Sequence, residues 1–179
     1  MSRDSKFLSR VLRHEPELIE IQLDPQGWVS VDDLLRRLKK AGRGLTRDQL
    51  QEIVQTNDKK RFTFSSDGHR IRAAQGHSVD VDLGLSPLVP PNVLYHGTAA
   101  QNLDAIFQMG LNPSRRRQVH LSLDQETAIR VGQRHGKPVV LRVDAGNMHA
   151  AGHVFTCSDN GVWLTDSVPA AYLGFGVLP

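Results

Sequence analysis

In the first third of the chain, apolar side chains recur three and four positions apart, which is the spacing of a helix with one buried face. This spacing predicts three helices, whose apolar positions fall at residues 7–12, 34–38 and 50–54. Ser30 is placed to begin the second helix, and Gly42 to end it. Thr46, with Gln49 three residues later, has the pattern of a capping box and begins the third helix.

Two short strand-like runs follow these helices, at residues 61–64 and 70–72. The stretch between them, residues 65–68, is made of turn-forming residues, so the two runs predict a β-hairpin. Three helices followed by a hairpin is the plan of a winged helix. Such domains often bind nucleic acid, but the same plan also serves as a protein contact, so the fold alone gives no function.

A proline-rich segment, residues 83–92, separates this part from the rest of the chain. Its three prolines remove backbone donors and favour extended geometry in the residues before them. We interpret the segment as a hinge between two lobes, which we place at residues 1–85 and 90–179.

The second lobe is rich in β-branched and aromatic runs, which favour strands. The predicted strands are residues 93–95, 119–121, 139–143, 153–156 and 162–165. Two helices fit between them, one closing at Gly110 and one capped by Asp124. The chain as a whole is therefore predicted to be α+β.

Composition narrows the class of protein. The chain has 179 residues with 39% hydrophobic content, enough for a real core in one or two domains. Its 22 Lys and Arg against 19 Asp and Glu are compatible with a polyanionic partner, and the cluster Arg115–Arg117 suits phosphate. Cys157 is the only cysteine, which excludes an intramolecular disulfide and is expected to be a small core residue. We see no signal peptide or membrane span and expect a cytoplasmic protein, or a nuclear one in a eukaryote.

Several polar residues in the first lobe are candidates for chemistry. Arg13 and His14 stand where Pro16 ends the first helix, so they either complement the helix dipole or serve a reaction, with His14 able to carry protons. Lys59 begins a charged run that is equally typical of a solvated turn. His77 lies in a Gln-Gly-His-Ser stretch, which fits either a polar loop or a close backbone approach to a ligand.

In the second lobe, His96 stands at an expected strand end before Gly97 and Thr98. The glycine would expose backbone groups to a ligand while the histidine bonds a ribose hydroxyl; a satisfied core histidine is the alternative. His120 alternates with apolar neighbours and faces away from them. Neither a glycine-rich phosphate loop nor the spacing of zinc ligands occurs in the sequence.

Together these segments resemble the RNA 2'-phosphotransferase family of the KptA type, from about residue 6 to residue 173. The stretches that carry the resemblance are residues 8–14, 27–29, 59–62, 71–78, 95–98, 116 with 119–122, and 161–165. The resemblance implies a winged helix followed by an ADP-ribosyltransferase-like lobe. It also implies a catalytic tetrad at Arg13, His14, Arg61 and Arg116. The implied NAD pocket comprises His96, Gly97, Thr98, His120 and Ser122, and the expected RNA-phosphate contacts are Lys59, Arg72 and His77.

Three positions vary from related proteins. Gln118 stands where the family often has histidine, and Ser114 where methionine is common, but both leave the tetrad intact. Val162 stands where many protein-modifying relatives of the second lobe carry a catalytic glutamate, which fits phosphate as the nucleophile.

The activity implied by the resemblance is NAD-dependent removal of an internal RNA 2'-phosphate. NAD would be consumed as a co-substrate without a metal, giving 2'-hydroxyl RNA, nicotinamide and ADP-ribose 1'',2''-cyclic phosphate. The expected partner is a tRNA-like RNA carrying a 2'-phosphate, and we expect a monomer. Two alternatives remain: an ADP-ribosyltransferase that modifies a terminal phosphate of nucleic acid, and a non-catalytic winged-helix protein that binds RNA.

Overall fold

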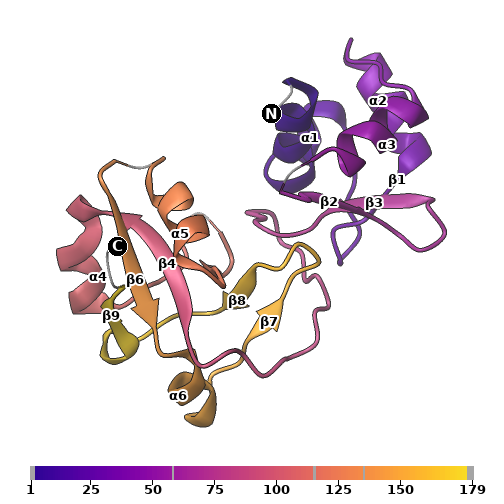
Figure 1. Cartoon of the computed structure of the whole chain (residues 1–179). Coiled ribbons are helices and arrows are strands. Elements are labelled where there is room, and N and C mark those ends of the chain that lie inside the picture. Colours follow the sequence, from indigo (N-terminus) through magenta and orange to yellow (C-terminus); the bar gives the residue numbers. More distant parts are fainter. Residues whose placement is uncertain (1–2, 58, 115, 135, 177–179) are drawn as a thin grey trace. The chain divides into compact units, whose positions relative to one another are not determined.

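The chain divides into two compact units, Met1–Gly84 and Leu85–Pro179, in a computed structural model (Figure 1). The structure describes residues 3–57, 59–114, 116–134 and 136–176. Each unit has its own cluster of buried apolar side chains. Helices and small antiparallel sheets occur in both units, which confirms the α+β class.

The described residues of the N-terminal unit include three α-helices and one 3-10 helix. They are α1 (Arg3–Arg13), η1 (Pro16–Ile19), α2 (Val31–Lys40) and α3 (Arg47–Gln55). α1 ends before Pro16, as the sequence predicts, because proline disfavours helical geometry in the residue before it. The capping box of α3 is also confirmed: Thr46 accepts a bond from the main chain of Gln49, whose side chain bonds back.

The helices of this unit are accompanied by a three-stranded antiparallel sheet in the order β1-β3-β2. Its strands are β1 (Val29–Ser30), β2 (Phe62–Phe64) and β3 (Arg70–Ala73). β2 and β3 form the predicted hairpin, and Gly68 in its turn has a φ of 71°. β1 was not predicted, because two residues are too short to show an alternating pattern.

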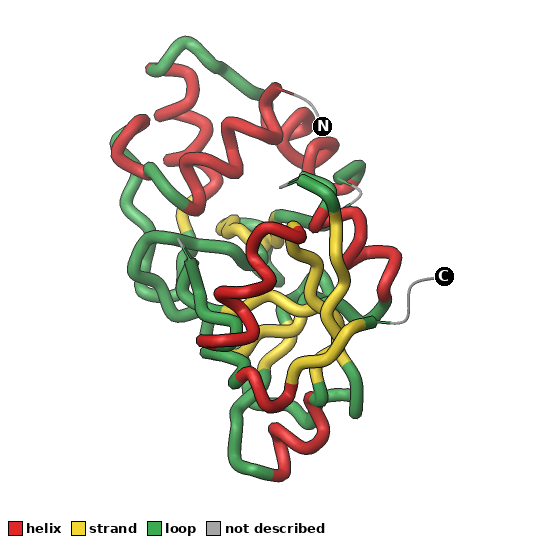
Figure 2. The backbone as a smooth tube through the Cα atoms, turned by 90° about the vertical axis from the view of Figure 1, so that its left-hand side faces the viewer, coloured by secondary structure: helices red, strands yellow, loops and turns green. Residues whose placement is uncertain are grey.

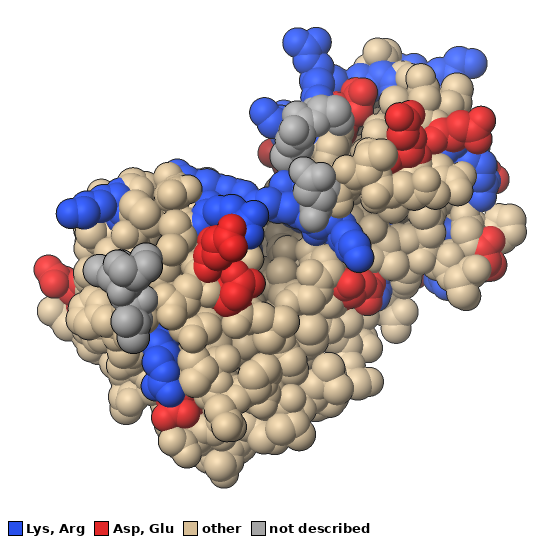
Figure 3. Space-filling model, in the orientation of Figure 1, with Lys and Arg blue, Asp and Glu red and all other residues tan. Residues whose placement is uncertain are grey.

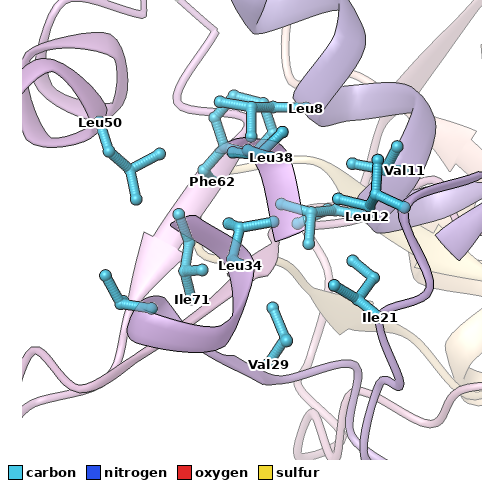
Figure 4. Packing of buried hydrophobic residues seen from close by; sticks show 13 residues of the cluster. Leu8, Val11, Leu12, Ile21, Val29, Leu34, Leu38, Leu50, Phe62 and Ile71 are labelled. Carbon is cyan, nitrogen blue, oxygen red and sulfur yellow. The ribbon is translucent and has the colours of Figure 1, made fainter. Parts of the chain in front are cut away.

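The core of the N-terminal unit lies between its helices and one face of the sheet (Figure 4). Leu8 and Leu12 of α1, Leu34 of α2 and Ile71 of β3 are all fully buried. The leucines follow the helical spacing in the sequence, and Ile71 lies in the predicted hairpin. Burial of each such side chain contributes about 1.5–3 kcal/mol to folding.

Two three-stranded antiparallel sheets form the C-terminal unit, in the orders β4-β6-β9 and β5-β8-β7. The strands are β4 (Leu94–Ala99), β5 (Val119–Leu121), β6 (Pro138–Val143), β7 (Thr156–Cys157), β8 (Trp163–Thr165) and β9 (Leu173–Phe175). The sheets meet where Tyr95 and Ser122 exchange two main-chain hydrogen bonds, of 2.9 and 2.8 Å. β4 and β5 are therefore neighbours, although they belong to different sheets.

Helices surround these strands (Figure 2). They are η2 (Ala100–Asn102), α4 (Leu103–Met109), α5 (Gln125–Gly132), α6 (Ala145–Ala150) and η3 (Ala170–Tyr172). α5 packs against β4 and β6, and α4 packs against η3. The predicted ends of two helices are confirmed: Asp124 accepts a bond from Thr127 N at the start of α5, and Gly110 follows α4 with a φ of 77°. No helix in the described ranges has both the length and the apolar character needed to cross a bilayer.

Two sequence-based expectations about the strands of this unit are wrong. β4 continues to Ala99, so His96, Gly97 and Thr98 lie inside a strand and not at its end. The reason is that pairing with β6 extends as far as Ala99 and Pro138. The strand expected at residues 153–156 is only Thr156–Cys157, because His153 N bonds to Met148 O at the end of α6.

Candidate functional site

The end of α1 contacts the start of the hairpin in the N-terminal unit. Arg13 is only 9% exposed, and its Nη2 lies 3.4 Å from the carbonyl oxygen of Arg61. The same carbonyl accepts a 2.8 Å bond from Ala74 N. These contacts bring together two of the arginines that the sequence singled out, although they are far apart in the chain.

His14 follows α1 and has an exposed side chain. Its Nδ1 lies 2.9 Å from Ser78 Oγ. Ser78 in turn donates to the Arg13 carbonyl, through its main-chain N at 2.9 Å and its hydroxyl at 3.5 Å. With the hydroxyl proton directed to that carbonyl, Ser78 Oγ can accept a hydrogen bond from a protonated His14 Nδ1. Nε2 is then the nitrogen of His14 that can exchange a proton with a substrate.

Arg61 is half-buried immediately before β2, and its side chain is held by Asn57. The Nη1 atom of Arg61 donates to Asn57 Oδ1 over 2.9 Å. Lys59 is exposed, and its main-chain N donates to the same oxygen at 3.2 Å. Lys60 has a φ of 41°, a left-handed conformation that is uncommon for a residue with a side chain.

Arg72 and His77, the other expected RNA contacts, are buried. Arg72 Nη1 donates to the carbonyl oxygens of Gln26 at 3.3 Å and Leu83 at 2.9 Å. Its guanidinium lies 4.4 Å from the ring centroid of Trp28. In these positions Arg72 fixes main-chain segments of the N-terminal unit, and its contact with RNA stays a prediction, as does that of His77.

In the C-terminal unit, hydrogen bonds connect the two histidines of the expected nucleotide pocket. His96 Nδ1 lies 3.0 Å from the His120 carbonyl oxygen, and His120 Nδ1 lies 2.9 Å from the Gln118 carbonyl oxygen. A carbonyl only accepts, so Nδ1 of each ring carries a proton and Nε2 of the neutral ring carries the lone pair. Ser122 is half-buried beside them, bonded to Tyr95 through its main chain.

Gly97 is buried where β4 meets α5. A Cβ atom on Gly97 would lie 1.7 Å from the carbonyl oxygen of Ala128, so only glycine allows this close approach. Thr98 is 5% exposed, and its Oγ1 accepts a 3.2 Å bond from Asn102 Nδ2. Gly97 therefore has a packing role at this point, and its contact with NAD stays a prediction.

Arg116 and Arg117 are exposed in the segment before β5. Partial desolvation, followed by the like charge of Arg134, lowers the pKa of the Arg116 guanidinium, which still stays charged at neutral pH. Arg115, the third member of the predicted cluster, lies outside the described residues. Figure 3 shows Lys and Arg side chains along the top of the C-terminal unit, with Asp and Glu side chains directly below some of them. An anion beside Arg116 would relieve its repulsion with Arg134.

Cys157 is half-buried, and its side chain packs against the core of the C-terminal unit. Burial, followed by the charge of Asp159, raises the pKa of its thiol. A thiol held in its protonated form is a poor nucleophile, so its properties agree with the predicted packing role. Across the described residues, no three His, Cys, Asp or Glu side chains are grouped so that they could hold a metal ion.

Comparison with known proteins identifies the family. The family model described as RNA 2'-phosphotransferase, Tpt1 / KptA family, matches residues 2–167. The chain belongs to the RNA 2'-phosphotransferase family. A probable RNA 2'-phosphotransferase of Agrobacterium fabrum is 60% identical over 169 residues, covering 94% of this chain and 91% of the relative. Relatives with the same description from Hahella chejuensis and Nostoc punctiforme are 56% and 53% identical, each covering 94% of this chain and 91% and 93% of their own length. Members of this family are transferases, as the sequence predicts.

The expected tetrad of this RNA 2'-phosphotransferase family member is also contacted by side chains that were not among the predicted site residues. Asn57 bonds Arg61, and Ser78 contacts His14. Ser78 lies 64 residues from His14, so only the fold places them together. Asn57 had a local signal, since asparagine in a turn often bonds the main-chain N–H two residues on, as it does here with Lys59.

Proposed function

We propose that this chain removes an internal 2'-phosphate from RNA in a reaction that consumes NAD. The observation that carries the proposal is the set of contacts that gathers Arg13, His14 and Arg61 in the N-terminal unit. These are three of the four positions that correspond to the family's tetrad. Arg116, the fourth, is exposed in the C-terminal unit and has a second arginine near it.

The proposal includes the fold of each unit. A winged helix for the N-terminal unit is supported by three helices accompanied by an antiparallel sheet that ends in a hairpin. An ADP-ribosyltransferase-like lobe for the C-terminal unit is supported by two small sheets that meet at Tyr95 and Ser122. The domains would then divide near the proline-rich segment, close to residues 85–90.

The residues of the C-terminal unit fit a nucleotide such as NAD. His96 and His120 are half-buried, and their Nδ1 protons are given to main-chain carbonyls. Their Nε2 atoms are therefore acceptors, suited to ribose hydroxyls or to the N–H groups of a carboxamide. The hydroxyl of Ser122 and the polar atoms of Thr98 would add further contacts.

NAD would supply the anomeric carbon at which the RNA 2'-phosphate displaces nicotinamide, and the 2''-hydroxyl that then attacks that phosphate. Arg61 and Arg116 would hold the phosphate and offset negative charge in the transition state, each contributing on the order of 3 kcal/mol. His14 would donate a proton from Nε2 to the departing RNA 2'-oxygen, because an alkoxide is a poor leaving group. Arg13 is buried, and its contact with the Arg61 carbonyl would help to hold the main chain at Arg61. Its guanidinium would add positive charge to the phosphate site.

The test is an assay with a short RNA that carries one internal 2'-phosphate, together with NAD and a metal chelator. The expected products are 2'-hydroxyl RNA, nicotinamide and ADP-ribose 1'',2''-cyclic phosphate, separated by chromatography. Free inorganic phosphate, or a requirement for a divalent ion, would contradict the proposal. Nicotinamide release without cyclic phosphate would instead identify an ADP-ribosyltransferase, and no release at all would favour a non-catalytic RNA-binding protein.

A further inference from the structure

Asn57 uses both ends of its side-chain amide. Its Oδ1 accepts bonds from Arg61 Nη1 at 2.9 Å and from Lys59 N at 3.2 Å. Its Nδ2 donates to Ser5 Oγ at 2.9 Å, and Ser5 is a buried residue of α1. Both groups that face Oδ1 are N–H donors, so this orientation of the amide is the one that satisfies its neighbours.

The arginine that Asn57 contacts is held at its other end as well. The Arg61 carbonyl accepts bonds from Ala74 N and from Arg13 Nη2, while its guanidinium is bonded by Asn57. An arginine side chain is long and flexible, and fixing its planar fork in advance reduces the entropy lost when it binds a phosphate. The partner of Nη1 is a neutral amide, so Asn57 itself places no negative charge beside the Arg61 guanidinium. A carboxylate at the same place would form an ion pair with Arg61 and compete with the phosphate.

We propose that Asn57 is a positioning residue for Arg61: it orients the guanidinium toward a phosphate of the substrate, and its lack of charge is part of that role. Asn57 acts through Arg61 and does not itself touch the phosphate. The inference rests on the proposed function, because it takes the RNA 2'-phosphate as the ligand of Arg61. A purely structural role, in which Asn57 only ties the turn after α3 to α1, is the competing explanation.

Asn57→Asp tests the role of charge, because aspartate has the same shape and keeps acceptors for Lys59 N and Arg61. It also loses the Nδ2 donor to Ser5, for which Ser5→Ala is the control. Binding is measured without NAD, by fluorescence anisotropy, on two RNAs that differ only in one internal 2'-phosphate. We expect Asn57→Asp to lower the preference for the phosphorylated RNA about tenfold and to leave binding of the unphosphorylated RNA unchanged. In an Arg61→Ala background the same substitution has no further effect, because the two residues act as one unit. Equal losses in both backgrounds, or an unchanged preference, would overturn the proposal.

A second measurement needs no RNA. Asn57→Ala removes the bond to Nη1, so the Arg61 guanidinium should gain mobility, which NMR relaxation of its side-chain N–H groups detects. Ser5→Ala is the matched control for the tie to α1, and it should leave the Arg61 signals nearly as in the unsubstituted protein. Unchanged Arg61 mobility in Asn57→Ala would refute the positioning role whatever the substrate is. If the unsubstituted protein binds both RNAs equally while Asn57→Ala frees Arg61, the proposed function is wrong and the positioning of Arg61 still holds.

Discussion

At the scale of single residues, Arg61 and Arg116 are suited to tests that separate catalysis from packing. Arg61 is half-buried and Arg116 is exposed, so neither side chain fills a core. We expect Arg61→Ala or Arg116→Ala to lower turnover of 2'-phosphorylated RNA roughly a hundredfold or more, because each loses a charge that stabilises the transition state. The melting temperature should change little. Both quantities can be measured on the same preparations.

The control for these two variants is Arg36→Ala, which removes an arginine whose side chain is 74% exposed on α2. That substitution should leave turnover near the level of the unsubstituted protein, because exposed ion pairs contribute little. If Arg36→Ala and Arg61→Ala lowered turnover equally, a general loss of positive charge would explain both. Arg13 is unsuitable for this test, since it is buried and its removal would also disturb the contact between α1 and Arg61.

His14 allows the two steps of the proposed reaction to be separated. Its Nδ1 is engaged with Ser78, so its Nε2 is the atom expected to protonate the departing RNA oxygen in the second step. His14→Ala should therefore accumulate RNA that still carries ADP-ribose, while nicotinamide is released as before. Gel mobility of labelled RNA, with nicotinamide measured in parallel, detects this. Loss of both products together would show that His14 is needed already in the first step.

Some features of this site follow from local sequence, and others depend on contacts between distant residues. Arg13 and His14 could be placed at a helix end, because Pro16 stops α1 whatever the rest of the chain does. The contacts of Arg13 with Arg61 and of His14 with Ser78 join residues 48 and 64 positions apart. The spacing of residues in the sequence does not reveal such distant contacts. The burial of Arg13, Arg72 and His77 depends on contacts of this kind, so it could not be predicted.

At the scale of elements, the helices and the hairpin of the N-terminal unit were predictable because their signals are local. A capping box at Thr46 and a turn at Gly68 each act within a few residues. The length of β4 was not predictable, because it depends on pairing with β6. The two strands are separated in the sequence by η2, α4, β5 and α5. Short elements such as β1, β9 and α6 lack enough residues for a periodic pattern.

The packing of α5 on β4 gives a prediction at this scale. A Cβ atom at Gly97 would lie 1.7 Å from Ala128 O, which belongs to the main chain and cannot rotate away. Gly97→Ala should therefore force α5 from the sheet and lower the free energy of unfolding by about 3 kcal/mol or more. Gly174→Ala in β9 is the matched control, because no atom lies within 4 Å of its Cβ position. Chemical denaturation of both variants measures the difference, and equal stabilities would contradict the close contact.

At the scale of the whole molecule, the four positions of the expected tetrad are divided between two units, and each unit has its own apolar core. Arg13, His14 and Arg61 belong to Met1–Gly84, whereas Arg116 belongs to Leu85–Pro179. A unit with its own core is expected to fold alone. We therefore expect residues 85–179 alone to bind NAD weakly, because His96, His120 and Ser122 all lie within this part of the chain.

The same fragment should release no nicotinamide with 2'-phosphorylated RNA, because it lacks three of the four positions proposed to act on the phosphate. Adding residues 1–84 as a separate chain should restore a small, concentration-dependent turnover, since mass action then replaces the covalent link. NAD binding is measured by calorimetry and nicotinamide by chromatography, with circular dichroism to establish that each fragment is folded. Turnover by residues 85–179 alone near the rate of the whole chain would mean that His14 and Arg61 are not catalytic. It would also leave the N-terminal unit as an RNA-binding accessory, so this one comparison tests the proposed assignment of residues in both units.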